Sequence, residues 1–183
     1  MDILESPIYS YLENTRAGKT VTMYGERNLR IRQAVPGDAS AIAAVLYESF
    51  LEYRASYTRE GFAATTPGRD QILLRMQEGP VWVAVLARDV VGTASAVVKP
   101  GGLYVRGMAV LPVARCRRVG ELLLEEIARF AGEHNCRRLF LSTTPFLERA
   151  IRLYERFGFR RIDEGPHHLF GTPLFMMEKV ISK

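Results

Sequence analysis

The chain has 183 residues and a formal charge of +5 at pH 7, with 48% hydrophobic and 25% charged residues. This balance is typical of a soluble globular domain with one core, and it excludes disordered, collagenous and disulfide-stapled chains. The positive excess is too small and too dispersed to indicate a nucleic-acid partner by itself. We therefore expect a single domain without nucleic acid.

The cysteines and histidines give no sign of a disulfide framework or a metal site. Cys116 and Cys136 have no metal-ligand spacing with His134, His167 or His168. Few cysteines fit a reducing cytoplasm best. We expect no metal and a cytoplasmic location.

Residues 1–28 are expected to form an N-terminal extension ahead of a domain over 29–183. The extension starts with acidic residues and tyrosines, where a signal peptide has a basic start and an apolar centre. The longest apolar run of the chain falls far short of the roughly 18 residues that a membrane span needs, so no membrane partner is expected. One short helix in the extension would contain Ile8, Tyr9, Tyr11 and Leu12.

The first half of the domain alternates between strand and helix patterns. Residues 29–35, LRIRQAV, alternate as a half-buried strand does, and a turn ending at Asp38 supplies the N-cap of the next helix. Apolar residues at helical spacing from Ile42 to Tyr53 give that helix a core face. Residues 54–67 fit a loop or a short irregular helix, and a second helix is predicted over Arg69 to Glu78.

The second half carries most of the strands. Residues 81–87 and 90–98 form a predicted hairpin, and 103–111 add a third antiparallel strand. A long helix, a strand over 137–143, a helix over 146–157 and a last strand over 173–181 follow. The order β-α-α-β-β-β-α-β-α-β predicts an α/β (α+β) domain with a mixed, mostly antiparallel central sheet flanked by helices.

Residues 110–130, VLPVARCRRVGELLLEEIARF, place arginines at the start of a helix, where the helix dipole is already positive. The unpaired N–H groups of a strand-to-helix turn favour phosphate, and Arg115, Arg117 and Arg118 would add mobile charge. Solvated surface arginines are the alternative. Gly120 in the first turn favours the anion site, because glycine costs about 1 kcal/mol there unless something approaches closely.

The segment MAVLPVARCRRVGELLLEEI resembles the acyl-CoA-binding signature of the GCN5-related N-acetyltransferase (GNAT) family, Arg/Gln-x-x-Gly-x-Gly/Ala. Arg115 takes the place of the leading arginine and Gly120 that of the second glycine. Arg118 stands where the first glycine is usual, and we expect ordinary helical backbone there, which still offers its N–H. Cys116, where glycine is also common, is expected to be a tolerated small residue.

The resemblance covers about residues 29–181. LRIRQAVPGDASAIAAVL is similar to the opening strand and helix of the family, RDVVGTASAVV to its central hairpin, AIRLYERFGFRR to its closing helix and FMMEKVI to its final strand. It implies acetyl-CoA as cosubstrate, with backbone groups of a splayed strand binding its pantetheine arm and thioester carbonyl. The implied cofactor contacts are Met108 and Val110 on that strand and Arg115, Arg117, Arg118, Val119, Gly120 and Glu121 around the phosphates.

Tyr154 falls at the position of the family's usual general acid. A phenol with a pKa near 10 keeps its proton until a thiolate with a pKa of about 8.5 forms beside it. A core tyrosine is the alternative, because Tyr154 shares a helical stripe with Ile151 and Phe157. Leu147 replaces an asparagine that contacts the cofactor in relatives, so that contact is expected to be absent.

The general base is not identified by the sequence. Glu48, Glu52 and Glu60 fall near where relatives hold the acceptor, but solvated charges are the alternative for each. His167 and His168 could titrate near neutral pH, and we assign neither of them a role.

Acceptor specificity is expected from residues 53–67 and 164–172, where Tyr53, Tyr57 and Phe62 either wall the acceptor or pack in the core. The resemblance implies transfer of an acetyl group to a primary amine of a small molecule or protein by direct attack in a ternary complex, and a homodimer. Two alternatives stay open: a catalytically weakened CoA-binding sensor or scaffold, and a basic interaction domain that never binds CoA.

Overall fold

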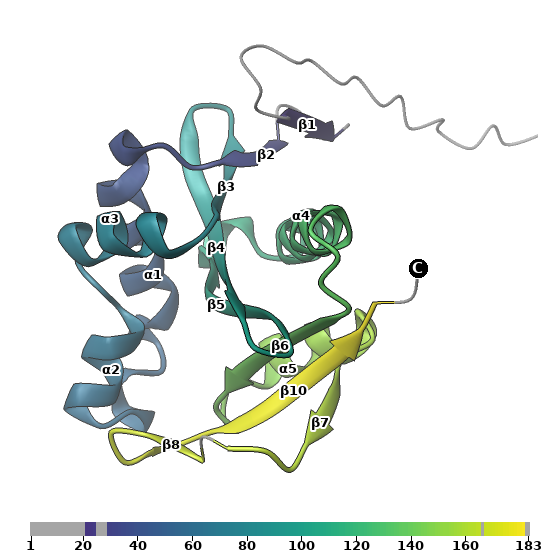
Figure 1. Ribbon diagram of the computed structural model, residues 1–183. Coiled ribbons are helices and arrows are strands. Elements are labelled where there is room, and N and C mark those ends of the chain that lie inside the picture. The colour runs from purple at the N-terminus through teal and green to yellow at the C-terminus, as the bar shows by residue number, and fades with distance from the viewer. Residues whose placement is uncertain (1–20, 25–28, 166, 182–183) are drawn as a thin grey trace, which may run out of the picture.

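The computed structural model describes residues 21–24, 29–165 and 167–181 (Figure 1). The predicted helix around Ile8 lies outside this part of the chain. The helices are α1 (Ala39–Leu51), α2 (Arg59–Thr65), α3 (Arg69–Glu78), α4 (Val119–Glu133) and α5 (Glu148–Arg156). The strands are β1 (Val21–Tyr24), β2 (Leu29–Gln33), β3 (Val81–Leu86), β4 (Asp89–Lys99), β5 (Gly102–Val110), β6 (Arg138–Thr143), β7 (Arg160–Ile162), β8 (His168–Leu169), β9 (Thr172–Pro173) and β10 (Phe175–Val180).

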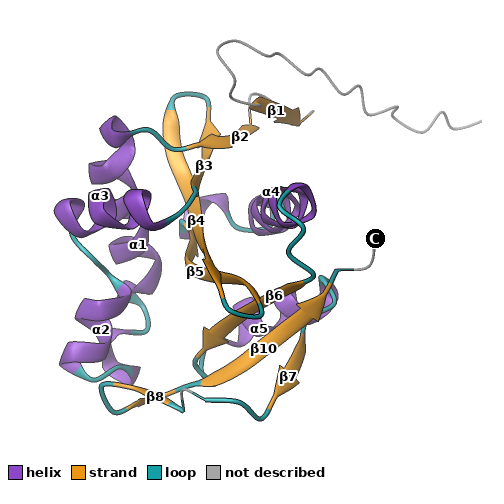
Figure 2. Cartoon of the chain, in the orientation of Figure 1, coloured by secondary structure: helices purple, strands orange, loops and turns teal. Residues whose placement is uncertain are grey.

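The central sheet has the order β1-β2-β3-β4-β5-β6-β10-β7. Its neighbouring strands are antiparallel except for β5 and β6, which are parallel because α4 crosses between them. Strands β8 and β9 form a separate hairpin. Figure 2 shows the sheet with helices on both sides. The predicted fold class, a mixed and mostly antiparallel sheet flanked by helices, is confirmed.

The structure adds short elements to the predicted order. Within 54–67, α2 forms because the Thr58 hydroxyl caps it, accepting a hydrogen bond from the Gly61 N–H at 3.0 Å. The three-residue strand β7 pairs with β10, and is too short to show an alternating pattern. Strand β1, inside the segment expected as an extension, pairs with β2 at the sheet edge.

Two hydrophobic clusters cover the two faces of the sheet. Val83 points to the face covered by α1 and α3, while Trp82 and Ala84 belong to the cluster beneath α4. Figure 1 shows α1 and α3 on one side of β3–β5 and α4 on the other. Because both faces are covered, β3 is apolar along its whole length rather than alternating.

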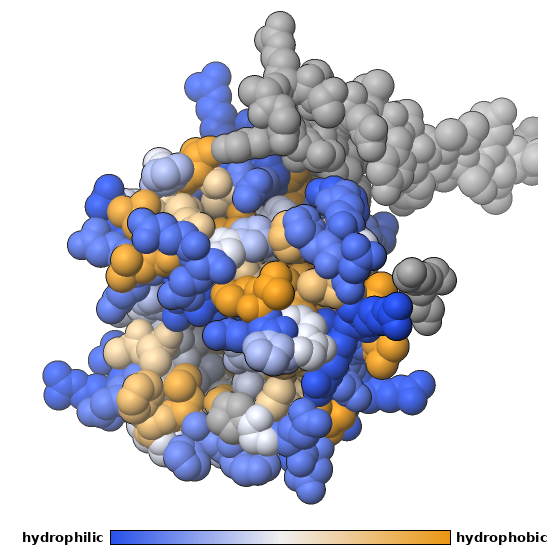
Figure 3. Space-filling model, viewed as in Figure 1, coloured by the Kyte–Doolittle hydropathy of each residue, from blue (hydrophilic) through white to orange (hydrophobic). Residues whose placement is uncertain are grey.

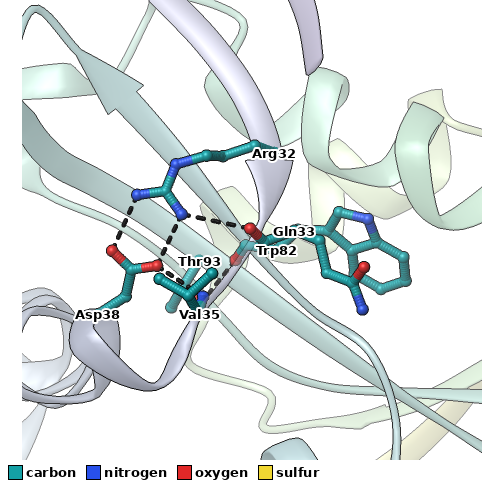
Figure 4. Close-up of polar contacts among 6 residues, drawn as sticks. All are labelled: Arg32, Gln33, Val35, Asp38, Trp82 and Thr93. Atoms are coloured by element: carbon teal, nitrogen blue, oxygen red, sulfur yellow. Dashed lines mark hydrogen bonds and ion pairs between the residues drawn. The ribbon is translucent and has the colours of Figure 1, made fainter. Parts of the chain in front are cut away.

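The link between β2 and α1 is fixed by Arg32 and Asp38 (Figure 4). The guanidinium donates to both carboxylate oxygens, at 2.6 and 2.8 Å, and the Val35 N–H donates to the same carboxylate at 2.8 Å. Asp38 therefore occupies the predicted N-cap position of α1, but its side chain caps the preceding 3₁₀ turn and not the first turn of α1.

The surface is mixed in character. Figure 3 shows hydrophobic residues in small separate patches among hydrophilic ones on the face in view. Among the described residues, no helix has the length and apolar character to cross a membrane. The same residues include no group of three or more His, Cys, Asp or Glu side chains that could hold a metal ion.

Candidate functional site

The parallel strands β5 and β6 separate before they end. Their register pairs Leu103–Val105 with Leu139–Leu141, yet β5 runs on to Val110 and β6 to Thr143. Figure 1 shows β6 and β10 turned away from the direction of β3, β4 and β5. In the described part of the chain, no strand therefore pairs with this edge of β5 beyond Val105. Such an unpaired edge is what the family resemblance implies for the cofactor-binding strand.

A bulge opposite β4 increases this divergence. The pairing of β4 with β5 shifts between Thr93 and Ser95, where Gly107 of β5 has a φ of +58°. A glycine takes this left-handed backbone without a Cβ penalty, and bulges bend the strand that carries them.

A cavity of about 970 Å³ lies between the separated strands and reaches the start of α4 and one side of α5. This volume matches that of ligand pockets in general. The residues of the splayed strands that line the cavity are Tyr104, Val105, Arg106, Gly107, Met108, Ala109 and Val110 from β5, and Leu141, Ser142 and Thr143 from β6.

Three buried polar atoms of residues that line the cavity have no hydrogen-bond partner among the described residues. They are Ser49 Oγ, Arg106 Nε and Ser142 Oγ. Buried polar groups in folded proteins are nearly always hydrogen-bonded. Because these atoms have almost no accessible surface, they make the cavity wall polar without contacting a ligand directly.

The first turn of α4 presents backbone N–H groups to the cavity. The first hydrogen bond within the helix runs from the Leu122 N–H to the Arg118 carbonyl at 3.0 Å, so the amides of Val119, Gly120 and Glu121 precede it. All three residues line the cavity. Together with the helix dipole, these amides can hold an anion.

Arg118 does not have the ordinary helical backbone that we expected, so that prediction is wrong. Its φ and ψ are 58° and 8°, a left-handed conformation, and Cys116 also has a positive φ of 65°. This conformation costs other residues roughly 1–2 kcal/mol and costs glycine little, which explains why glycine is usual at both positions.

The guanidinium groups of the arginine cluster are partly held by the protein itself. Arg115 pairs with Glu52, the residue directly after α1, and donates to the Ser49 carbonyl at 3.4 Å. Arg118 donates from Nε to Glu121 at 2.9 Å. Arg115 and Arg118 line the cavity, whereas the exposed Arg117 does not. Ion pairs at a surface are weak, so an anion can compete for these groups.

Gly120 is needed for a close approach, but the approaching group belongs to the protein. A Cβ at this position would lie 2.7 Å from Leu153 Cδ2 of α5 and 3.5 Å from Met108 Cε. The glycine therefore lets α5 and β5 pack against the first turn of α4.

Tyr154 lies on α5, is only 7% exposed and lines the cavity. Its ring packs against Phe159, with a centroid distance of 5.8 Å. The sequence left open whether Tyr154 is a core residue or a site residue. In the structure it is both, because it belongs to the core cluster and also lines the cavity. Burial raises the pKa of Tyr154 well above its usual value, and the nearby phenols of Tyr57 and Tyr104 raise it further. The hydroxyl therefore keeps its proton at neutral pH.

The glutamates considered as candidate bases are not part of the cavity lining. None of Glu48, Glu52 and Glu60 lines it, and Glu52 is paired with an arginine. Among the described residues that line the cavity, Glu121 is the only one with a carboxylate side chain. His168 lines the cavity and His167 does not.

An aromatic wall lines the part of the cavity near α1. Tyr53 and Tyr57 line it, as does Phe50, while Phe62 supports Tyr57 from behind at a centroid distance of 6.1 Å. Burial raises the pKa of Tyr57, so this phenol is also neutral. Leu147, at the N-cap of α5, adds an apolar side chain.

The two segments expected to set acceptor specificity are joined by hydrogen bonds. The Thr58 N–H donates to Thr172 Oγ1 at 3.0 Å, and the Thr58 hydroxyl donates to the Phe170 carbonyl at 2.8 Å. The residue before α2 is thereby tied to the β8–β9 hairpin.

Several cavity residues had no place in the sequence analysis. Arg149, Arg152 and Arg156 recur three and four positions apart, a spacing that puts them on one face of α5 and that could have revealed them. Arg75 and Arg106 come from elements far apart in the chain, and only the tertiary structure brings them together.

Comparison with known proteins agrees with this architecture. The family described as "Acetyltransferase (GNAT) family" matches residues 43–159. A relative described as the uncharacterized N-acetyltransferase YjgM of Escherichia coli (strain K12) is 30% identical over 139 residues, which cover 73% of this chain and 83% of that one. The expected enzyme class, an N-acetyltransferase, is confirmed.

Solved structures show the same fold. PaiA N-acetyltransferase from Thermoplasma acidophilum, in complex with coenzyme A, has a TM-score of 0.73 at 16% identity, over 84% of this chain and 99% of that one. The acetyltransferase yncA from Salmonella typhimurium, with its cofactor acetyl-CoA, has a TM-score of 0.68 at 20% identity, over 85% of this chain and 95% of that one. Since the family model matches residues 43–159 and YjgM is 30% identical over 73% of the chain, this protein belongs to the acetyltransferase (GNAT) family.

Proposed function

We propose that this protein transfers the acetyl group of acetyl-CoA to a primary amine by direct attack in a ternary complex. The observation that carries the proposal is the single cavity that both Tyr154 and the first turn of α4 line. A proton donor and an anion site thus face the same space, beside a strand edge with free backbone groups. Acetyl-CoA supplies the acetyl group as a thioester.

The cavity residues fit acetyl-CoA in polarity and charge. The amides of Val119, Gly120 and Glu121, with Arg115 and Arg118 beside them, would hold the diphosphate. The separated edge of β5 at Met108 and Val110 would hold the pantetheine arm. Arg117, which does not line the cavity, would act at most through its charge.

The proposed chemistry needs a neutral amine, a donor for the developing oxyanion and an acid for the leaving sulfur. A backbone N–H on the free edge of β5 would serve the oxyanion. Tyr154, which is protonated at neutral pH, would donate its proton to the sulfur as the thiolate forms. The only carboxylate among the described cavity residues, Glu121, lies in the first turn of α4, where the diphosphate is proposed to bind. We therefore propose that the amine loses its proton to water.

Ligand binding tests the cofactor assignment. Acetyl-CoA or CoA at about 1,000 times its Kd should stabilise the fold by roughly 4 kcal/mol, seen as a rise in Tm. Arg115→Gln and Arg118→Gln should reduce this shift, whereas Arg69→Gln, an exposed arginine outside the cavity, should leave it unchanged. If neither ligand moves Tm, the cofactor assignment is wrong.

The hydroxyl of Tyr154 tests the mechanism. Tyr154→Phe removes the proton donor and keeps the ring, so kcat should fall by about 10²–10³-fold while the CoA-induced Tm shift persists. Tyr47→Phe is the matched control, because Tyr47 is 45% exposed and does not line the cavity. An unchanged kcat in Tyr154→Phe would remove this residue from the mechanism.

The sensor or scaffold alternative predicts a different result from the same proteins. A CoA-induced rise in Tm without thiol release across a broad amine panel would support it. The position of Tyr154 on the cavity wall favours the enzyme.

The proposal also includes a cellular location and an oligomeric state. We place the enzyme in the cytoplasm as a homodimer, which cell fractionation and light scattering would test. A monomer at all concentrations used would contradict the dimer.

A further inference from the structure

Two of the cavity arginines outside the proposed cofactor site lie at the β5 bulge. Arg75 of α3 and Arg106 of β5 both line it. Arg75 is half-buried, and its Nη2 donates to the Ala64 carbonyl at 3.3 Å. Its Nη1 lies 3.4 Å from the place where a Cβ on Gly107 would be, so the guanidinium lies directly beside the β5 bulge.

The charges around these arginines do not balance. Glu78 pairs with Arg106, while Arg75 has no carboxylate within ion-pair distance in the described part of the chain. Burial lowers the pKa of Arg75, and the charge of Arg106 lowers it further, against smaller opposing effects of Glu78 and Tyr104. One positive charge is therefore left over at a half-buried place, where a charge without a partner is costly.

Arg106 adds a second positive charge beside Arg75. Glu78 holds its guanidinium, and its charge acts on Arg75, so the two cations lie near each other on the cavity wall. An anion on Arg75 would therefore be attracted by Arg106 as well.

The anion would bind close to the reacting thioester. Gly107 directly precedes Met108, whose backbone is proposed to hold the end of the pantetheine arm, and successive Cα atoms are about 3.8 Å apart. An acceptor with its anion on Arg75 and its amine at the thioester must therefore have the two groups only a few bonds apart. An α-amino acid satisfies this requirement.

The rest of the acceptor would face aromatic rings. Phe50, Tyr53 and Tyr57 line the same cavity, and Tyr57 packs edge-on against Phe50 and Phe146, at centroid distances of 6.3 and 4.8 Å. Such a wall favours an apolar or aromatic side chain over a charged one.

We propose, on the basis of the function proposed above, that the acceptor is a free amino acid with an apolar or aromatic side chain, and that Arg75, assisted by Arg106, binds its carboxylate. The C–N bond of the new amide forms as the C–S bond of the thioester breaks. The nitrogen loses one proton to water, and the sulfur gains the proton that Tyr154 donates and later recovers from water. The products are an N-acetyl amino acid and CoA.

Binding of the product tests the carboxylate subsite without any cofactor. The probes are the N-acetyl derivatives of phenylalanine, tyrosine, leucine and methionine, each compared with its C-terminal amide by calorimetry. At least one acid should bind the wild type on the order of 100-fold more tightly than its amide, because the amide leaves the arginines unpaired. Arg75→Gln should remove the difference, and Arg75→Lys should retain part of it.

Turnover gives an independent readout with acetyl-CoA. The free amino acid should have a kcat/KM on the order of 100-fold higher than its amide, mainly through KM. Arg75→Gln should lower kcat/KM for the acid and change that for the amide less than about threefold. Arg69→Gln is the control, because this arginine lies on the same helix, is exposed and pairs with Asp70.

The outcomes separate this inference from the proposed function. If acids bind better than amides in an Arg75-dependent way but CoA never binds, the subsite stands and the acetyltransfer proposal fails. If CoA binds and amines are acetylated with no preference for the acid, the inference is overturned and the acetyltransfer proposal stands. If no acid binds more tightly than its amide, the inference is also overturned.

Discussion

At the scale of single residues, the turn before α4 departs from the glycine pattern of the family at two positions. Cys116 and Arg118 both adopt left-handed backbone, which other residues reach at a cost. Arg118 offsets part of that cost through its ion pairs with Glu121 and Glu125 at 2.9 and 3.5 Å. These are exposed contacts, worth about 0–1 kcal/mol each.

The backbone of Arg118 gives a prediction about stability. Arg118→Gly removes the left-handed penalty and the ion pairs together, while Arg118→Ala removes only the ion pairs. The glycine variant should therefore have a free energy of unfolding about 1 kcal/mol higher than the alanine variant, as measured by urea denaturation. At Arg117, whose φ is not positive, the order should be reversed. The same order at both positions would contradict the assignment.

At the scale of elements, patterns predicted most strands and helices, while tertiary contacts decided the rest. Helix α3 has the predicted bounds Arg69 to Glu78, because a proline and a glycine end it and its apolar residues keep helical spacing. The separation of β5 from β6 was expected only through the family resemblance. No local pattern encodes it, since it depends on where the parallel pairing stops.

Site residues that depend on tertiary contacts could not be predicted from local sequence patterns either. Tyr154 was expected through the resemblance, and the structure places it in the cavity. Arg75 could not be predicted as a site residue, because it reaches the cavity beside a bulge 32 positions later in the chain, at Gly107. Helical conformation at Arg118 was wrongly expected, because a backbone dihedral in a turn depends on its neighbours as well as on its own side chain.

The start of β5 carries a prediction about how the parallel pair is held. Gly102 has a φ of +153°, and a Cβ there would overlap the Arg138 carbonyl of β6. Gly102→Ala should therefore lower the free energy of unfolding by about 1–3 kcal/mol. Gly132→Ala, in α4 with nothing within 4 Å of its Cβ, should raise it by about 0.5–1 kcal/mol. Equal effects of the two substitutions in urea denaturation would refute the close contact.

At the scale of the whole molecule, arginines gather on the cavity. Seven arginines and one glutamate among the described residues line it. Ion pairs offset part of this charge, because glutamates just outside the lining pair with four of the arginines, Arg106, Arg115, Arg118 and Arg152. The sequence does not reveal this gathering, because the arginines are scattered along the chain and meet only in the fold. Concentrated charge in a cleft attracts anionic ligands from solution.

This concentration of charge predicts salt-dependent association. The association rate constant of CoA, measured by stopped flow, should fall by roughly tenfold or more between low and high ionic strength. Pantetheine, which lacks the phosphates, is the matched control and should associate at a rate that salt hardly changes. Equal salt dependence of the two ligands would show that the arginines do not steer binding.

The hydrogen bonds between Thr58 and the β8–β9 hairpin have a consequence for how the range of acceptors can change. Two stretches of chain more than a hundred residues apart are thereby held together, and each of them contributes residues to the cavity wall. Exchanging one stretch alone for that of a relative would break the hydrogen bonds between Thr58 and the hairpin. A graft that alters acceptor choice therefore has to carry both stretches together.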